Sequence, residues 1–113
     1  MVPATARDDT VTIGETDRDT LAMSGVLTFA TAARAYAEGG RALASGSQTR
    51  LDLAGVTRAD SAGLACVLAL AANASRDGRH LAVVHWPEGL RALAAVCDVE
   101  TLLDRSADQP AAA

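Results

Sequence analysis

The segment from Leu51 to Leu64 constrains the fold more than any other part of this chain. It reads LDLAGVTRADSAGL, an apolar run that ends in a polar corner, Asp60-Ser61, and continues into a pattern of small residues. Asp and Ser are favoured at helix N-caps because their oxygens accept hydrogen bonds from the free N–H groups of the first turn. The segment therefore predicts a strand followed by a helix, with the Ser61 hydroxyl at the helix start. One interpretation of the corner is a simple cap by Asp60 or Ser61. The other is a partner-binding site, where the helix dipole would favour a phosphate on Ser61.

The first half of the chain predicts a hairpin followed by a helix. Apolar and polar residues alternate over 11–13 and over 20–26, on either side of a charged turn. This pattern fits two paired strands. A helix is expected from Thr28 onward, with Thr28 as its N-cap, and Ser45-Gly46-Ser47 interrupts its pattern. The residues expected to face the sheet, because they recur at helical spacing, are Phe29, Ala32 or Ala33, Tyr36 and Leu43.

The second half repeats the alternation of strand and helix. A strand that begins with residues 49–53 is expected at a central position in the sheet. A helix over 62–76 that stops at Gly78 is expected to follow it. A buried strand over 81–86 and a helix over 87–96 follow. The order β-β-α-β-α-β-α predicts an α/β fold, a small sheet with helices packed against it. Six apolar residues are expected in its core, namely Leu53, Leu64, Leu68, Val83, Val84 and Leu93.

Composition excludes several classes of function. The 113 residues suffice for one domain, expected over 10–104 with tails at 1–9 and 105–113. The net charge is −4 and the ten basic residues are all scattered arginines, which argues against nucleic-acid binding. With no lysine, no phosphate-binding loop and no nucleophile elbow, we expect no enzyme activity and no cofactor. The histidines and cysteines lack zinc-site spacing, so no metal is expected, and Cys66 and Cys97 are predicted to be core residues.

The chain is also expected to meet a membrane only through a partner. The first 19 residues contain acidic side chains and no apolar signal region, which predicts a cytoplasmic protein. The longest strongly apolar stretch, 62–72, is too short to cross a bilayer.

Two stretches carry a resemblance to a known family. Residues 52–65, DLAGVTRADSAGLA, resemble the signature of STAS domains, found in sulfate-transporter tails and anti-sigma-factor antagonists. Residues 25–32, GVLTFATA, are similar to the strand-to-helix entry of the MlaB-type subunits of bacterial phospholipid-transport ABC systems. The resemblance covers about residues 10–104 and implies the STAS fold, a small mixed sheet with helices packed against it.

The resemblance implies a regulatory binding subunit. A MlaB-type subunit would bind and regulate the cytoplasmic ATPase of an ABC complex that transports phospholipid and maintains outer-membrane lipid asymmetry. Ser61 matches the key hydroxyl of the family, Asp60 the acidic residue before it and Gly63 the small residue after the corner. The expected partner-binding or phosphorylation site comprises Thr57, Asp60, Ser61, Ala62, Gly63 and Leu64.

Two alternatives stay open at this point. The chain resembles anti-sigma-factor antagonists more distantly, and in that class the partner is an anti-sigma factor kinase that phosphorylates Ser61. Ala62 and Ala65 depart from the pattern of many such antagonists, which favours the transport branch. The small residues of the predicted helix either admit a partner closely or pack within the domain. They are Ala62, Gly63, Ala65, Ala69 and Ala72.

Overall fold

A four-stranded mixed sheet forms the centre of the computed structural model, which describes residues 9–99. The strands are β1 (Val11–Asp17), β2 (Thr20–Leu27), β3 (Arg50–Ala59) and β4 (Ala82–Val84), in the spatial order β1-β2-β3-β4. β1 and β2 form the predicted antiparallel hairpin, while β3 runs parallel to both β2 and β4. The predicted element order and the central place of β3 are confirmed. The predicted tails, apart from Asp9, and the end of the expected domain at 100–104 lie outside the described residues.

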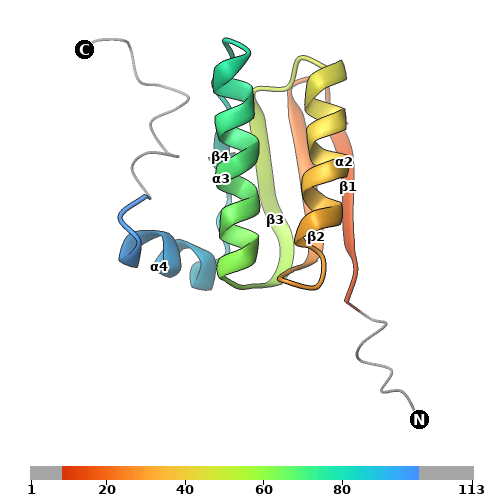
Figure 1. Ribbon diagram of the computed structural model, residues 1–113. Coiled ribbons are helices and arrows are strands. Elements are labelled where there is room, and N and C mark those ends of the chain that lie inside the picture. Colours follow the sequence, from red (N-terminus) through yellow and green to blue (C-terminus); the bar gives the residue numbers. More distant parts are fainter. Residues whose placement is uncertain (1–8, 100–113) are drawn as a thin grey trace.

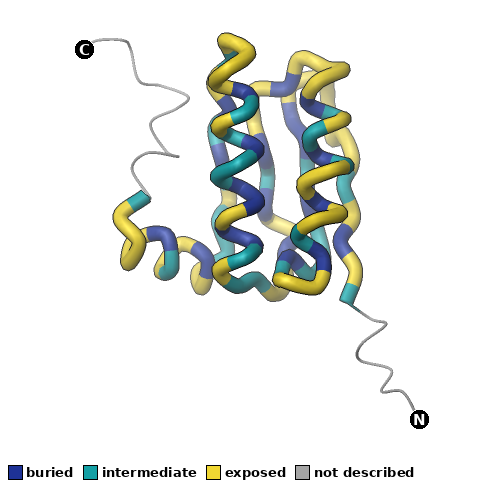
Figure 2. The backbone as a smooth tube through the Cα atoms, in the orientation of Figure 1, coloured by how far each residue is buried: buried dark blue, intermediate teal, exposed yellow. Residues whose placement is uncertain are grey.

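Two long helices cover one face of this sheet. α2 (Ala32–Ser45) and α3 (Ser61–Arg76) lie side by side in front of the strands, whereas α4 (Glu88–Val96) lies beside the start of α3 (Figure 1). Buried positions recur along both long helices where they face the sheet and each other (Figure 2). The arrangement is the predicted α/β fold, a small mixed sheet with helices packed against it. Within residues 9–99, no helix combines the length and apolar character needed to cross a membrane.

The start of α2 differs from the prediction. Residues 28–31 form a turn, in which Thr31 N and Ala32 N donate to Thr28 O at 2.9 and 2.8 Å, and the helix begins only at Ala32. Thr28 is therefore not the N-cap. The residues that α2 buries are Ala35, Gly39 and Leu43, spaced four apart. Of the expected face Leu43 is confirmed, but Phe29 and Tyr36 are 86% and 41% exposed.

The expected core is only partly confirmed. Leu53, Leu64 and Val83 are buried, whereas Val84, Leu68 and Leu93 are half-buried. Val84 follows Val83 on a strand, so its side chain points to the opposite face of the sheet, away from the two long helices. Leu68 and Leu93 pack at the margin of the core.

Two predictions near the C-terminal end were wrong. The strand expected over 81–86 is only three residues long, because His85 adopts a left-handed backbone with φ 59° that ends it. Cys97 is exposed at the end of α4, whereas Cys66 is a buried core residue as predicted. Burial raises the pKa of the Cys66 thiol to about 11, so this cysteine acts as a small apolar side chain.

Two leucines of α3, Leu68 and Leu70, test which face of this helix is buried. Leu70 is fully buried and Leu68 is not. We expect Leu70→Ala to lower the free energy of unfolding by about 2–5 kcal/mol. Leu68→Ala should cost clearly less because its side chain retains part of its contact with water. Urea unfolding of both variants measures the difference, and an equal or reversed loss would contradict the assigned face.

Candidate functional site

The predicted corner lies where two parallel strands end. Leu27 of β2 pairs with Ala59 of β3, so the turn 28–31 and Asp60 leave the sheet side by side. A hydrogen bond from Asp60 N to Leu27 O, 3.3 Å, extends the pairing beyond the strands. Parallel strands place their carboxyl ends at the same edge of a sheet, which is the edge where open α/β folds bind ligands.

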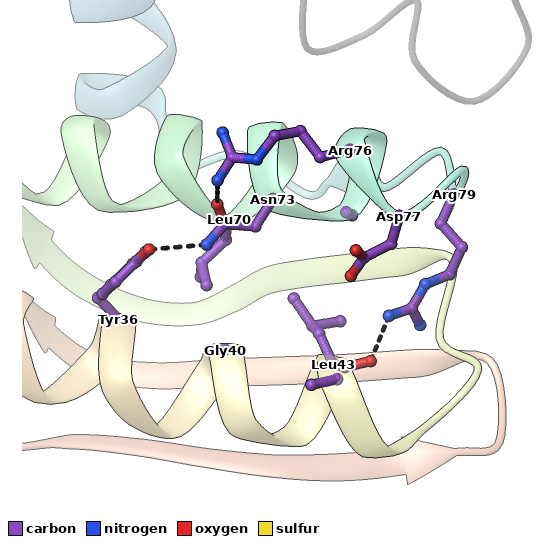
Figure 3. A pocket seen from close by; sticks show the side chains of 10 residues that line it. Tyr36, Gly40, Leu43, Leu70, Asn73, Arg76, Asp77 and Arg79 are labelled. Atoms are coloured by element: carbon purple, nitrogen blue, oxygen red, sulfur yellow. Dashed lines mark hydrogen bonds between the residues drawn. The ribbon is translucent and has the colours of Figure 1, made fainter.

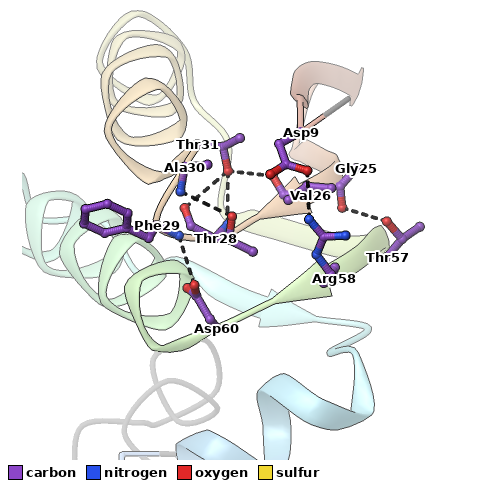
Figure 4. A network of polar contacts seen from close by, with 10 residues as sticks. All are labelled: Asp9, Gly25, Val26, Thr28, Phe29, Ala30, Thr31, Thr57, Arg58 and Asp60. Carbon is purple, nitrogen blue, oxygen red and sulfur yellow. Dashed lines mark hydrogen bonds and ion pairs between the residues drawn. The ribbon is translucent and has the colours of Figure 1, made fainter. Parts of the chain in front are cut away.

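Asp60 holds both segments together. Its Oδ1 accepts hydrogen bonds from Ala62 N (2.9 Å) and Gly63 N (3.1 Å), which caps α3. Its Oδ2 accepts from Phe29 N at 3.0 Å, across 31 residues of sequence (Figure 4). The cap was one of the two predicted roles of this corner, and the structure assigns it to Asp60. The bond to Phe29 could not be expected from the local sequence.

These donors also shift the ionisation of Asp60. Desolvation by burial acts to raise the pKa of Asp60, but the backbone N–H groups of Phe29, Gly63, Ala62 and Asp60 itself stabilise the carboxylate. The balance lowers the pKa below its ordinary value of 3.8. The carboxylate is therefore charged at neutral pH, where it matches the positive end of the α3 dipole.

A pH dependence of stability follows from this shift. Because the folded pKa lies below the unfolded one, Asp60 contributes its full stabilisation above pH 3.8 and loses it as the pH falls through the folded value. We expect Asp60→Asn to cost about 1–2 kcal/mol at pH 7, since an amide has one oxygen to offer the three N–H donors. The difference from wild type should shrink as the pH falls below 3.8 in urea unfolding. A difference that stays constant over this range would contradict the role of the charge.

The turn before α2 is fixed by its own threonines. Thr31 Oγ1 donates to Val26 O (2.7 Å) and accepts from Thr28 N (3.0 Å), while Ala30 N donates to Thr28 Oγ1 at 3.3 Å. Thr31 is 5% exposed, so these bonds are largely shielded from water. Together with Asp60 they hold the backbone on both sides of Phe29, whose side chain is 86% exposed.

Ser61 is the first residue of α3 and is exposed. Among the described residues, none is hydrogen-bonded to its side chain, because Asp60 already satisfies the nearby N–H groups. Its hydroxyl is thus free to meet another molecule. Thr57 is also exposed, but its Oγ1 donates to Gly25 O of β2 at 3.2 Å.

The remaining residues of the expected site lie further inside. Ala62 is half-buried, and Gly63 and Leu64 are buried. A Cβ on Gly63 would come within 2.2 Å of Leu27 O, so this glycine allows α3 to approach the end of β2 closely. Of the two interpretations of the small residues, the structure favours packing within the domain for Gly63. Gly63 and Leu64 can therefore support the site only by positioning α3.

A shallow apolar groove runs between the first halves of α2 and α3. Its walls are formed almost entirely by small side chains. They are Ala32, Ala33, Tyr36, Ala62, Ala65, Cys66 and Ala69. No charged residue lines this groove, which reaches Ala62, the residue after Ser61. Tyr36, predicted to face the sheet, instead stands at its wall.

Beyond Tyr36 the space between the two helices becomes polar (Figure 3). Asn73 Nδ2 donates to Tyr36 Oη at 2.7 Å, and Arg76 donates to Asn73 Oδ1. Arg79 donates to Gly46 O (3.0 Å), Gln48 O (3.2 Å) and Leu43 O. Arg79 thereby satisfies carbonyl groups at the end of α2, so its contribution here is structural.

Within residues 9–99, no three His, Cys, Asp or Glu side chains are grouped so that they could hold a metal ion. The chemistry available at the corner is a free hydroxyl, a fixed carboxylate and an adjoining apolar surface. Such a set suits the binding of another macromolecule.

Comparison with known proteins identifies the domain. Residues 11–104 match a family model described as "Mlab, STAS domain". A search of curated protein sequences returns no significant match. Among solved structures, the fold is similar to that of the anti-sigma factor antagonist SpoIIAA in its unphosphorylated form, with a TM-score of 0.64 and 15% sequence identity. The alignment covers 80% of this chain and 82% of that one, and at this identity it supports the shared fold alone.

Proposed function

This chain belongs to the MlaB-type STAS domain family, and from that premise we propose that it binds and regulates the ATPase of a phospholipid-transporting ABC complex. In this proposal it is a non-catalytic subunit in the cytoplasm, and it reaches the inner membrane only through the complex. The transport it supports would maintain the lipid asymmetry of an outer membrane.

The observation that carries the proposal is the setting of Ser61. This small hydroxyl is exposed at the first position of α3. The next residue, Ala62, lines the uncharged groove between α2 and α3. An interface centre favours uncharged groups that can be desolvated cheaply, so a partner can approach this corner closely. The fixed carboxylate of Asp60 keeps the helix start in place while the partner binds.

The test uses the full chain and the ABC ATPase encoded nearest to it in its genome. The two proteins should co-elute in gel filtration when co-expressed, and the ATP turnover of the ATPase should change when the chain is added. Co-elution with a histidine-kinase-like anti-sigma factor, and none with the ATPase, would instead identify an antagonist switched by phosphorylation of Ser61. That result would overturn the proposal.

A further inference from the structure

Phe29 is an exposed aromatic residue on an otherwise closely packed domain. It is the chain's only phenylalanine, and its side chain is 86% exposed. Large apolar side chains that remain in water are informative when they lie in a patch with a common character, since such patches mark interaction sites. Aromatic side chains at the centre of an interface supply much of its binding energy.

The backbone that carries Phe29 is rigidly held. Phe29 N donates to Asp60 Oδ2, and the hydrogen bonds of Thr28 and Thr31 close the turn on either side. The ring points away from Thr57 and Arg58 in Figure 4. Because the backbone of this turn is already fixed, binding costs little further backbone entropy, and Phe29 projects from the same place before and after a partner binds.

The surroundings of Phe29 define the chemistry of what it would meet. Ala30 follows Phe29 in the turn, Ala33 lies in the first turn of α2, and Ser61 and Ala65 lie in the first two turns of α3, which Asp60 joins to Phe29. All four residues are exposed and uncharged. The nearby charged residues all have partners. The Asp60 carboxylate accepts hydrogen bonds from three backbone N–H groups. Arg34 pairs with Glu38 at 3.3 Å and Arg58 with Asp9 at 2.8 Å. A complementary surface must therefore be uncharged and apolar, because an unpaired charge facing this patch would lose its water without gaining a partner.

We propose that Phe29 is the anchor by which this chain docks onto the ABC ATPase, with its ring in an uncharged pocket of aliphatic side chains on that subunit. Asp60 is a positioning residue, because its carboxylate fixes the Phe29 backbone and the start of α3 at once. This inference rests on the proposed function, since it names the contact through which the same partner is bound.

The test is a titration of the purified ATPase with the full chain and its variants. Phe29→Ala should weaken binding about 30-fold or more, the loss typical of an interface hot spot. Phe29→Leu should recover part of the loss because it restores apolar volume. The matched control is Val96→Ala, which removes another exposed apolar side chain, 82% exposed on α4, and should leave the affinity unchanged. Circular dichroism establishes that each variant is folded.

A double-mutant cycle tests the positioning role. Asp60→Asn should weaken binding in the wild-type background and much less when Phe29 is already alanine, whereas a loss of general stability would act in both backgrounds. The Phe29 amide should also exchange with deuterium faster in Asp60→Asn.

The outcomes separate the two proposals. If the wild type does not bind the ATPase, the proposed function is wrong and this inference falls with it. Binding that persists at wild-type affinity in Phe29→Ala overturns the anchor alone. Self-association of the wild type that is lost in Phe29→Ala, with unchanged ATPase affinity, would assign Phe29 to contacts between copies of this chain and would also overturn it.

Discussion

Adding a single methyl group at Gly63 is expected to destabilise this domain by about 3 kcal/mol. The new Cβ would lie 2.2 Å from Leu27 O and 3.0 Å from Leu27 Cγ. The first of these atoms belongs to the backbone at the end of β2, so relief requires α3 to move away from the sheet. Overpacking of this kind typically costs 1–3 kcal/mol, and a backbone obstacle places Gly63→Ala at the upper end of that range.

Gly89 provides the matched control for this substitution. It lies near the start of α4, and a Cβ there would meet nothing within 4 Å. Gly89→Ala should therefore leave stability unchanged or raise it by up to about 1 kcal/mol, since alanine is the better helix former. Urea unfolding followed by circular dichroism compares the two. A Gly63→Ala variant within 0.5 kcal/mol of wild type would show that α3 does not depend on this close approach.

The corner at Asp60 was predictable because its causes are local. An Asp-Ser pair between an apolar run and a small-residue pattern specifies a strand, a cap and a helix start, and α3 begins at Ser61. The sequence left the choice of cap open between the two residues. The structure assigns the cap to Asp60, whose Oδ1 accepts from Ala62 N and Gly63 N, while its second oxygen accepts from Phe29 N.

The start of α2 was not predictable from its own residues. Thr28 has the character of an N-cap, but Thr31 binds Val26 O and converts residues 28–31 into a turn. Phe29 then leaves the helical register, and apolar spacing alone misassigns it to the core. Its exposure depends on contacts with Asp60, 31 residues away, which local patterns do not report.

The misplaced core residues have a common cause. An apolar residue is expected to be buried, but the local sequence does not show which face of a strand or helix the rest of the domain covers. Both long helices cover the same face of the sheet, so Val83 is buried and its neighbour Val84 is only half-buried. Cys97 is exposed because α4 has already ended at Val96.

The second large effect is expected at Ser61. Ser61→Glu should weaken binding of the ABC ATPase about 30-fold or more, because it places a carboxylate beside Asp60 in a contact that must lose water. Stability should not suffer, since an acidic residue in the first turn interacts favourably with the helix dipole. A loss of binding therefore cannot be attributed to unfolding.

Two further variants separate charge from shape at this position. Ser61→Thr keeps the hydroxyl and adds one methyl group, so its affinity should remain close to that of wild type. Ser61→Ala removes the hydroxyl without adding charge and should bind far better than Ser61→Glu. If Ser61→Ala loses as much affinity as Ser61→Glu, the loss comes from the missing hydroxyl contact and not from the added charge.

A calorimetric titration of the ABC ATPase with wild type and with Ser61→Glu determines whether the start of α3 is the binding surface. We expect saturable binding by the wild type, and we expect the Ser61→Glu variant to be folded but to bind at least about 30-fold more weakly. Equal affinities for the two proteins would contradict this expectation, because the interface would then lie away from the start of α3 and Ser61 would be only the first residue of a helix.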